Sequence, residues 1–175
     1  MKFFGSKSES AAGFGLIGDA LGRELLGTPL DASLLLMPLL RFLPKDDPRI
    51  RATVLAIADE LTRDGLVLRY QVDETDDGLS GEEGTFTICS FWLVSALSEI
   101  DEHERARDMC EKVLSYASPL LLYGEEIDPC SGRHLGNFPQ AFTHLALINA
   151  VMHVIRKEQA AQRRAMAREV PEGEE

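Results

Sequence analysis

The chain has 175 residues, of which 45% are hydrophobic and 27% are charged, and this balance is ordinary for a domain with its own core. Its formal net charge of −11 at pH 7 argues against nucleic acid or an anionic membrane surface as a partner, because both bind basic patches. No apolar run approaches the roughly 20 residues that span a bilayer, and the N-terminus is a poor signal peptide because Glu9 and several glycines interrupt it.

The first half of the chain predicts two helices of different kinds. Residues 30–43 are apolar almost all round, with Asp31 as a plausible N-cap and Pro38 as the point where the helix kinks or is interrupted. Residues 48–63 are amphipathic, and Pro48 occupies the first-turn position that favours proline. The first helix must therefore be covered on every side, whereas the second keeps one face in solvent.

The second half repeats this alternation. Residues 85–99 are again apolar almost all round, residues 102–117 are amphipathic, and residues 138–158 form a third apolar helix with a basic end. The loop that separates the two halves, at 64–84, contains the only candidate strand, at 66–72.

The alternation predicts an all-α fold of stacked hairpins, each with an inner and an outer helix, that repeat about every 50 residues. Residues 99–117 also resemble a tetratricopeptide repeat, which would give an α-solenoid. Such repeats have turns of a few residues, whereas the loops at 64–84 and 118–137 run to about 20 residues. Both loops follow an outer helix and precede an inner one, so we expect them at the same end of the stack, where they can carry function.

Two motifs carry a resemblance to a known family. They read DDGLSGEEGTFTICSFWLVSAL at 76–97 and LLLYGEEIDPCSGRHLGNFPQAFTHLALINA at 120–150. With the preceding hairpin LDASLLLMPLLRFLPKDDPRIRATVLAIADEL, they resemble the C-terminal part of glycoside hydrolase family 15, the glucoamylase and bacterial trehalase-like enzymes. The resemblance covers roughly residues 28–155.

The resemblance implies an (α/α) toroid of six helical hairpins, and the alternation of inner and outer helices agrees with it. The chain supplies about six of the twelve helices, so we expect about half of the toroid, formed by residues 28–158. Residues 1–27 precede this domain as a segment of uncertain structure, and residues 159–175 follow it as a charged tail.

The same resemblance implies hydrolysis of α-glucosidic bonds with inversion by two carboxylic acids, which stand about 6.5–9.5 Å apart around the attacking water. Glu125 takes the position of the general base, and Glu126 beside it contacts the sugar or supports the base. An adjacent pair of glutamates outside such a motif is more often a solvated loop pair, which is the alternative. The resemblance implies an α-glucoside as substrate, and we expect no cofactor and no metal.

Further sugar contacts are implied for residues before the inner helices. Arg69 and Tyr70 match an Arg-Tyr pair whose guanidinium grips the sugar, as a rigid fork of donors suits vicinal hydroxyls. Gln140 is expected to face the same pocket from the start of the last inner helix. Glu83 is a further candidate, although a carboxylate there is equally explained by the dipole of the helix it precedes. The alternative for Arg69 is a surface arginine.

Other candidate sites fit their chemistry less well. The acidic run at 73–78 suggests a calcium loop, but Thr75 and Gly84 occupy positions where ligands are needed. Cys89 lies within an apolar helix and is interpreted as a buried core thiol. His134 lies in a loop with no evident partner.

The cysteines indicate the compartment. They are odd in number and far apart in the sequence, which suits free thiols in a reducing environment and not a disulfide framework or a zinc site. They are Cys89, Cys110 and Cys130. We therefore expect a cytoplasmic protein.

Residues 1–68 contain nothing that resembles the general-acid motif of the family, so we expect the isolated chain to be inactive. Two hypotheses follow. The chain is part of a glycoside hydrolase, as a truncated reading frame, a fragment or one part of a split enzyme, or it is a non-catalytic helical scaffold that retains the fold. A half toroid leaves apolar flanks at residues 30–43 and 138–155, which predicts self-association or a partner chain that completes the ring.

Overall fold

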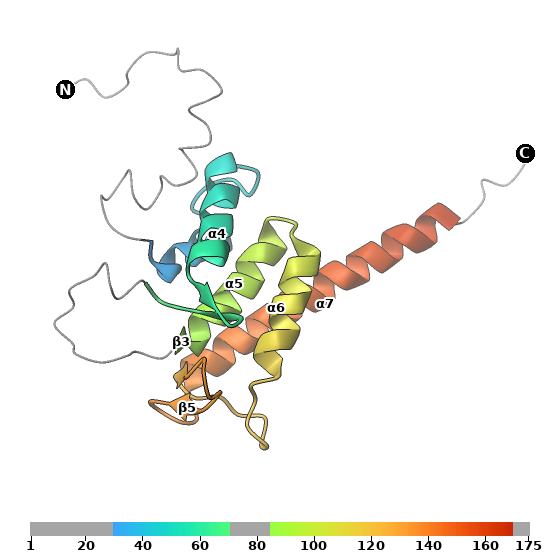
Figure 1. Cartoon of the computed structure of the whole chain (residues 1–175). Coiled ribbons are helices and arrows are strands. Elements are labelled where there is room, and N and C mark those ends of the chain that lie inside the picture. Colours follow the sequence, from blue (N-terminus) through green and yellow to red (C-terminus); the bar gives the residue numbers. More distant parts are fainter. Residues whose placement is uncertain (1–29, 71–84, 170–175) are drawn as a thin grey trace, which may run out of the picture.

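Helix α5 (Thr87–Glu99) runs through the middle of the structure, a computed structural model that describes residues 30–70 and 85–169 (Figure 1). Nearly all of its residues are buried, as expected for a helix that is apolar all round. Its most extensive contacts are with α7 (Ala141–Glu169) and α6 (His103–Leu114). The rest of the described fold is arranged around this helix.

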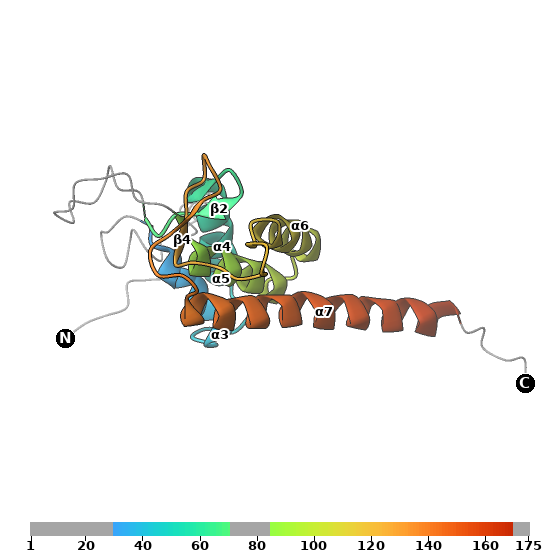
Figure 2. The same ribbon diagram turned by 90° about the horizontal axis from the view of Figure 1, so that it is seen from below.

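The other helices cover α5 from two sides. In Figure 2, α4 (Pro48–Glu60) and α6 lie on one side of α5, and the long helix α7 lies on the other. A 3₁₀ turn, η1 (Ala32–Leu35), leads into the short helix α3 (Leu36–Leu39), and both pack on α5. Among the described helices, α5 is covered and α4 and α6 keep one face in solvent, as the sequence predicts. The prediction that the other two apolar segments are covered on every side is wrong for the described structure, because Leu40 and Leu145 are exposed.

Short strands lie where α5 begins. The strands β1 (Thr62–Arg63) and β2 (Leu66–Val67) form an antiparallel hairpin. A second sheet has the order β3-β4-β5 and is also antiparallel. Its strands are β3 (Thr85–Phe86), β4 (Glu126–Ile127) and β5 (His134–Leu135). Strands β4 and β5 of the second long loop pair in this sheet with β3, and β2 of the first long loop contacts β3, so the described parts of the two loops lie at the same end of α5.

The core consists of two clusters that meet at α5. One cluster joins η1 and α4 to α5 and includes Leu35, Ile50, Val54, Ile57, Leu93 and Leu97. The other joins β2, α6 and α7 to α5 and includes Leu66, Phe91, Val94, Val113, Tyr123 and Ala150. Tyr123 is the largest fully buried side chain of the described residues, and it belongs to the loop that precedes β4.

Three of the predicted helices are confirmed with small shifts at their ends, namely α4, α5 and α6. The helix predicted at 30–43 is wrong in extent, because α3 ends at Leu39 and the chain turns at Arg41, where φ is 54°. Pro38 is accommodated within the single turn of α3. The strand predicted at 66–72 is limited, within the described part, to Leu66–Val67.

The last helix runs from Ala141 to Glu169, past the end predicted at 158. Residues 159–169 are mostly Ala, Gln, Arg and Met, which are strong helix formers, so the helix continues through the first part of the expected tail. The remaining tail, the N-terminal segment 1–27 and Glu83 lie outside the described residues. The described part holds five α-helices and one 3₁₀ turn that stack as hairpins, and the closed toroid stays a prediction.

Across the described ranges, no helix combines the length and the apolar character that a membrane span requires.

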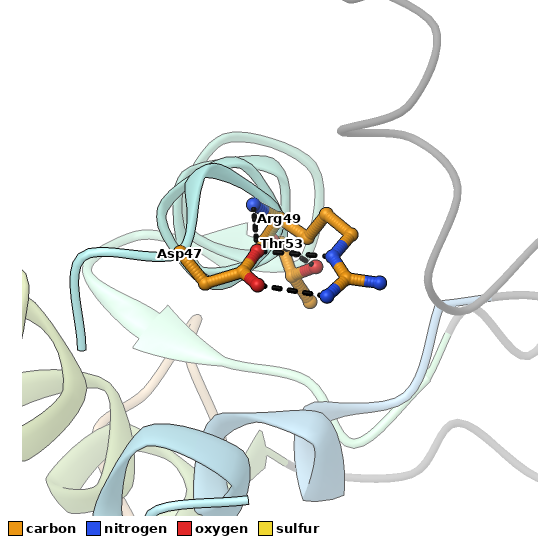
Figure 3. A network of polar contacts seen from close by, with 3 residues as sticks. All are labelled: Asp47, Arg49 and Thr53. Carbon is orange, nitrogen blue, oxygen red and sulfur yellow. Dashed lines mark hydrogen bonds and ion pairs between the residues drawn. The ribbon is translucent and has the colours of Figure 1, made fainter. Parts of the chain in front are cut away.

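Helix α4 begins with a charged cap. The Asp47 carboxylate accepts hydrogen bonds from the backbone N–H of Arg49 at 3.0 Å and from the Arg49 guanidinium at 2.7 and 2.9 Å (Figure 3). Thr53, one turn further, donates its hydroxyl to the Arg49 carbonyl at 2.8 Å. The hydrogen bonds from Arg49 lower the pKa of Asp47 to about 2, from its ordinary value of 3.8.

The lowered pKa predicts how this cap depends on pH. A carboxylate with a lowered pKa in the folded state stabilises above its unfolded value and loses this effect as the pH falls through its folded value. Asp47→Asn keeps an N-cap but removes the charge, so its melting temperature should lie below that of the unmodified protein at pH 6. The difference should shrink between about pH 4 and pH 2. Asp46→Asn, at the exposed neighbouring residue, is the control, and a pH-independent difference would contradict the assignment.

Candidate active site

Glu125 lies where three elements meet. Its carbonyl accepts a hydrogen bond from the backbone N–H of Thr87, the first residue of α5, at 3.0 Å. Its own N–H donates to the carbonyl of Asn137 at 2.9 Å. The backbone of Glu125 is thus held on one side by the start of α5 and on the other by the loop that follows β5.

The Glu125 side chain is half-buried and held by the same loop. Its Oε2 accepts hydrogen bonds from the Asn137 side-chain amide at 3.0 Å and from the Asn137 backbone N–H at 3.2 Å. No donor from the described part of the chain reaches Oε1. One oxygen is therefore fixed, while the other has no protein donor within residues 30–70 and 85–169.

Gly136 makes this arrangement possible. Its φ is +68°, which favours glycine, and a Cβ there would lie 2.8 Å from Glu125 Oε2 and 3.0 Å from Glu125 Cβ. The loop can approach Glu125 closely because this position carries no side chain. The Phe138–Pro139 peptide bond that follows is cis.

His134 secures the loop from the other side. The backbone N–H of Gly124 donates to His134 Nδ1 at 3.0 Å, so the ring proton is on Nε2, which donates to the Tyr116 carbonyl at 3.0 Å. The prediction that this histidine has no partner is wrong, because it bonds to Gly124 and Tyr116. The neutral ring connects the segment before Glu125 to the end of α6.

Tyr123 is the anchor of the same segment. Its hydroxyl donates to the carbonyls of Leu114 and Val113, at 3.2 and 3.3 Å, and burial raises its pKa to about 12. Its ring makes edge contacts with those of Phe91 and His134, whose centroids lie 5.5 and 6.0 Å away. The residue two positions before Glu125 is thus fixed in the core.

Arg69 lies at the same end of α5. It is exposed, and its guanidinium lies 5.7 Å from the centre of the Tyr70 ring and 6.0 Å from that of Phe86. Phe86 in turn pairs with Glu126 in the β3–β4 ladder. The chain therefore brings Arg69 and Tyr70 to the sheet that carries Glu126 and borders Glu125.

Gln140 lies just before α7, and its side-chain oxygen caps the first turn of that helix. Its backbone N–H donates to the Tyr123 carbonyl at 3.0 Å, and its Oε1 accepts from the Thr143 hydroxyl at 2.8 Å. This oxygen is therefore engaged within the helix, which favours a structural role for it.

The described structure has an apolar groove of about 460 Å³, and the candidate site residues at the start of α5 do not line it. The groove lies over α5 between α3 and α7, and its lining includes Leu39, Leu40, Ile88, Trp92 and Phe142. Arg69 contacts Phe86, Glu125 bonds to Thr87, and Gln140 bonds to Tyr123, but none of the three lines the groove, so their shared pocket stays a prediction. The two apolar segments that were predicted to be uncovered are residues 30–43 and 138–155. Side chains from both segments line the groove, from opposite sides.

The cysteines and the possible metal ligands were the remaining candidates from the sequence. Cys89 is buried, which confirms the predicted core thiol, and this burial raises its pKa to about 12. All three cysteines are free, and Cys130 is exposed. Within residues 30–70 and 85–169, no three His, Cys, Asp or Glu side chains lie close enough to hold a metal ion.

The chain belongs to the glycosyl hydrolases family 15, whose model matches residues 27–152. It is 78% identical over 137 residues to a trehalase of Mycobacterium tuberculosis strain H37Rv, a match that covers 78% of this chain and 20% of that protein. A trehalase of Mycolicibacterium smegmatis is 80% identical over 132 residues, or 75% of this chain and 20% of that protein. A trehalase of Thermoplasma volcanium is 45% identical over 120 residues, or 68% of this chain and 19% of that protein. The chain spans about a fifth of the length of these relatives, and no solved structure matches it.

Gly132 and Gly136 both have positive φ, but only Gly136 contacts Glu125. We therefore expect an alanine substitution to lower the stability of the protein more at Gly136 than at Gly132. Gly132 has φ +69°, but a Cβ there meets nothing nearer than the Tyr116 ring at 3.6 Å. Gly132→Ala should cost about 1–2 kcal/mol of stability for the left-handed conformation alone. Gly136→Ala should cost more, because its Cβ displaces the Glu125 carboxylate. The check is the NMR shift of the Asn137 side-chain amide, which should move in Gly136→Ala and not in Gly132→Ala; equal shifts would contradict the contact.

Proposed function

We propose that this chain supplies the general-base side of a family 15 active site, with Glu125 as the base. The observation that carries the proposal is the Glu125 carboxylate, which is held through Oε2 by two donors of Asn137 and keeps Oε1 without a donor in the described structure. In a chain of this family, such a carboxylate at the junction of α5, β4 and the loop before α7 is suited to orient a water.

The proposed reaction is hydrolysis with inversion. Glu125 takes a proton from water as the water oxygen bonds to the anomeric carbon from the face opposite the leaving group. The glycosidic C–O bond breaks, and a carboxylic acid on the other side of the sugar protonates the leaving oxygen. We assign that acid to another part of the family domain, since the chain spans about a fifth of its relatives.

We propose trehalose as the substrate among α-glucosides, because the relatives compared above are named trehalases. Arg69 is proposed to bind sugar hydroxyls, with its guanidinium positioned by the Tyr70 and Phe86 rings. Glu126, which is half-buried in the central strand β4, and Gln140 and Glu83 are further candidates for sugar contacts.

The toroid is part of the same proposal. In it, further helices of the domain pack on the apolar groove between α3 and α7, where Leu40 and Phe142 are 75% and 69% exposed. Burying such side chains is favourable by about 1.5–3 kcal/mol each, so the groove offers substantial binding energy to apolar helices. The three free thiols support a reducing compartment, and we propose the cytoplasm.

The test of Glu125 uses a chimera in which this chain replaces the matching segment of the Mycobacterium tuberculosis trehalase, which is 78% identical to it. Glu125→Gln should lower kcat for trehalose by about 10²–10⁴-fold, because the amide is nearly isosteric but accepts no proton, and should leave sugar binding intact. Glu111→Gln, on the exposed face of α6, is the control. A near-normal kcat in Glu125→Gln would exclude Glu125 as the base.

The isolated chain provides a second test, of the proposal that it carries the general base but not the general acid. Without an acid to protonate the leaving oxygen, the purified chain should release no glucose from trehalose above the buffer rate. Glucose release by the isolated chain that survives Glu125→Gln would show that the acid and base lie elsewhere in its sequence.

A further inference from the structure

Tyr123 and Gly124, which lead into Glu125, are buried, so each of their backbone groups needs a hydrogen-bond partner. The two carbonyls are bound by residues around the start of α7. The Tyr123 carbonyl accepts from the Gln140 N–H at 3.0 Å, and the Gly124 carbonyl accepts from the Thr143 hydroxyl at 3.2 Å. The two N–H groups are bound by side chains instead, and both of these side chains are histidines.

The two histidines form the same kind of bridge with opposite ring nitrogens. His134 accepts from the Gly124 N–H through Nδ1 at 3.0 Å, and its Nε2 donates to the Tyr116 carbonyl at 3.0 Å. His144 accepts from the Tyr123 N–H through Nε2 at 3.4 Å, a longer bond, and its Nδ1 donates to the backbone carbonyl four residues earlier at 2.7 Å. A carbonyl can only accept, so the proton is on Nε2 of His134 and on Nδ1 of His144.

Each ring can make both of its bonds only as a neutral imidazole in this one tautomer. The other tautomer, or a charged ring, would present an N–H to a backbone N–H, and the buried donor would lose its partner. Both rings also make edge contacts with the Tyr123 ring, with centroids 6.0 Å away in each case. The pair therefore holds the backbone and the side chain of the same short segment.

The two bridges attach this segment to two different elements. His134 lies in β5, where it pairs with Ile127 of β4, and His144 lies in α7, which packs along α5. Gly124 permits the close approach of the first ring, because a Cβ there would lie 3.2 Å from His134 Cβ and 3.4 Å from its Nδ1. The sheet and the last helix thus both fix the backbone directly before Glu125.

We infer that His134 and His144 are a pair of positioning residues for the proposed base, which hold the buried segment before Glu125 as neutral rings of opposite tautomer. This inference rests on the proposed function, because the pair positions a base only if Glu125 takes the proton. Neither ring is assigned a contact with the sugar or a proton transfer. A misplacement of about 1 Å can change a rate by about 100-fold, so release of this segment should act on kcat more than on KM.

The tautomers are tested in the unmodified chain by the ¹⁵N NMR shifts of its histidine rings at pH 8. We expect the ring proton on Nε2 of His134 and on Nδ1 of His144. We also expect a scalar coupling between the Gly124 amide nitrogen and His134 Nδ1, because the bond between them is N–H···N. A proton on Nδ1 of His134 or on Nε2 of His144 would overturn the inference, whatever reaction the site performs.

Crossed substitutions test the role in the chimera with the Mycobacterium tuberculosis trehalase. Asparagine places its side-chain oxygen near the position of a histidine Nδ1, and glutamine places its oxygen near that of Nε2. His134→Asn and His144→Gln therefore keep an acceptor for the backbone N–H, whereas His134→Gln and His144→Asn do not. The second pair should lower kcat for trehalose about 10- to 100-fold with little change in KM, and the first pair should retain most of it.

The Glu125→Gln background separates this role from a general loss of stability. If the histidines act through Glu125, His134→Gln should add little to the loss of kcat that Glu125→Gln causes. His103→Gln, at the exposed first residue of α6, is the control and should leave kcat unchanged. Near-normal kcat in Glu125→Gln would overturn the base assignment itself. A loss in Glu125→Gln with equal kcat in His134→Asn and His134→Gln would overturn the positioning role alone.

Discussion

The hydrogen bond from the Thr87 N–H to the Glu125 carbonyl connects the buried helix at the centre of the fold to the candidate base. Helix α5 is surrounded by packed side chains and has little freedom, so its first residue is a fixed reference point. The ladder β3-β4-β5 extends the connection, since Phe86 pairs with Glu126 and Ile127 with His134. The position of Glu125 thus follows from the packing of α5 more than from the loop in which it lies.

Around that reference point, the chain holds the loop by polar contacts that reach across it. His134 bridges Gly124 and Tyr116, and Asn137 bridges the backbone and side chain of Glu125. Each contact satisfies a backbone or carboxylate group that would otherwise be costly to bury. A loop fixed in this way can orient a catalytic group without being part of a regular element.

The sequence was sufficient to predict the features that depend on local interactions, such as where helices start and which helix is buried. Pro48 marks the start of α4, and the apolar character of residues 85–99 identifies α5 as buried. The sequence could not predict the contacts of His134 or Asn137. Their partners lie 10 to 18 residues away, so these contacts depend on the tertiary fold. Gly136 could have been noted as a position where the backbone approaches a neighbour closely, because glycine is the usual residue there. The long α7 was foreseeable from helix propensity alone, but the charged composition of its end suggested a tail.

In the proposed reaction, the Glu125 carboxylate points at a water beside the sugar. A crystal structure of the Glu125→Gln chimera with trehalose bound tests it most directly. We predict a water within about 2.6–3.2 Å of the side-chain oxygen of residue 125, on the far side of the anomeric carbon from the leaving oxygen, with Arg69 at the sugar hydroxyls. A bound sugar whose anomeric carbon lies away from residue 125, with no water between them, would contradict it.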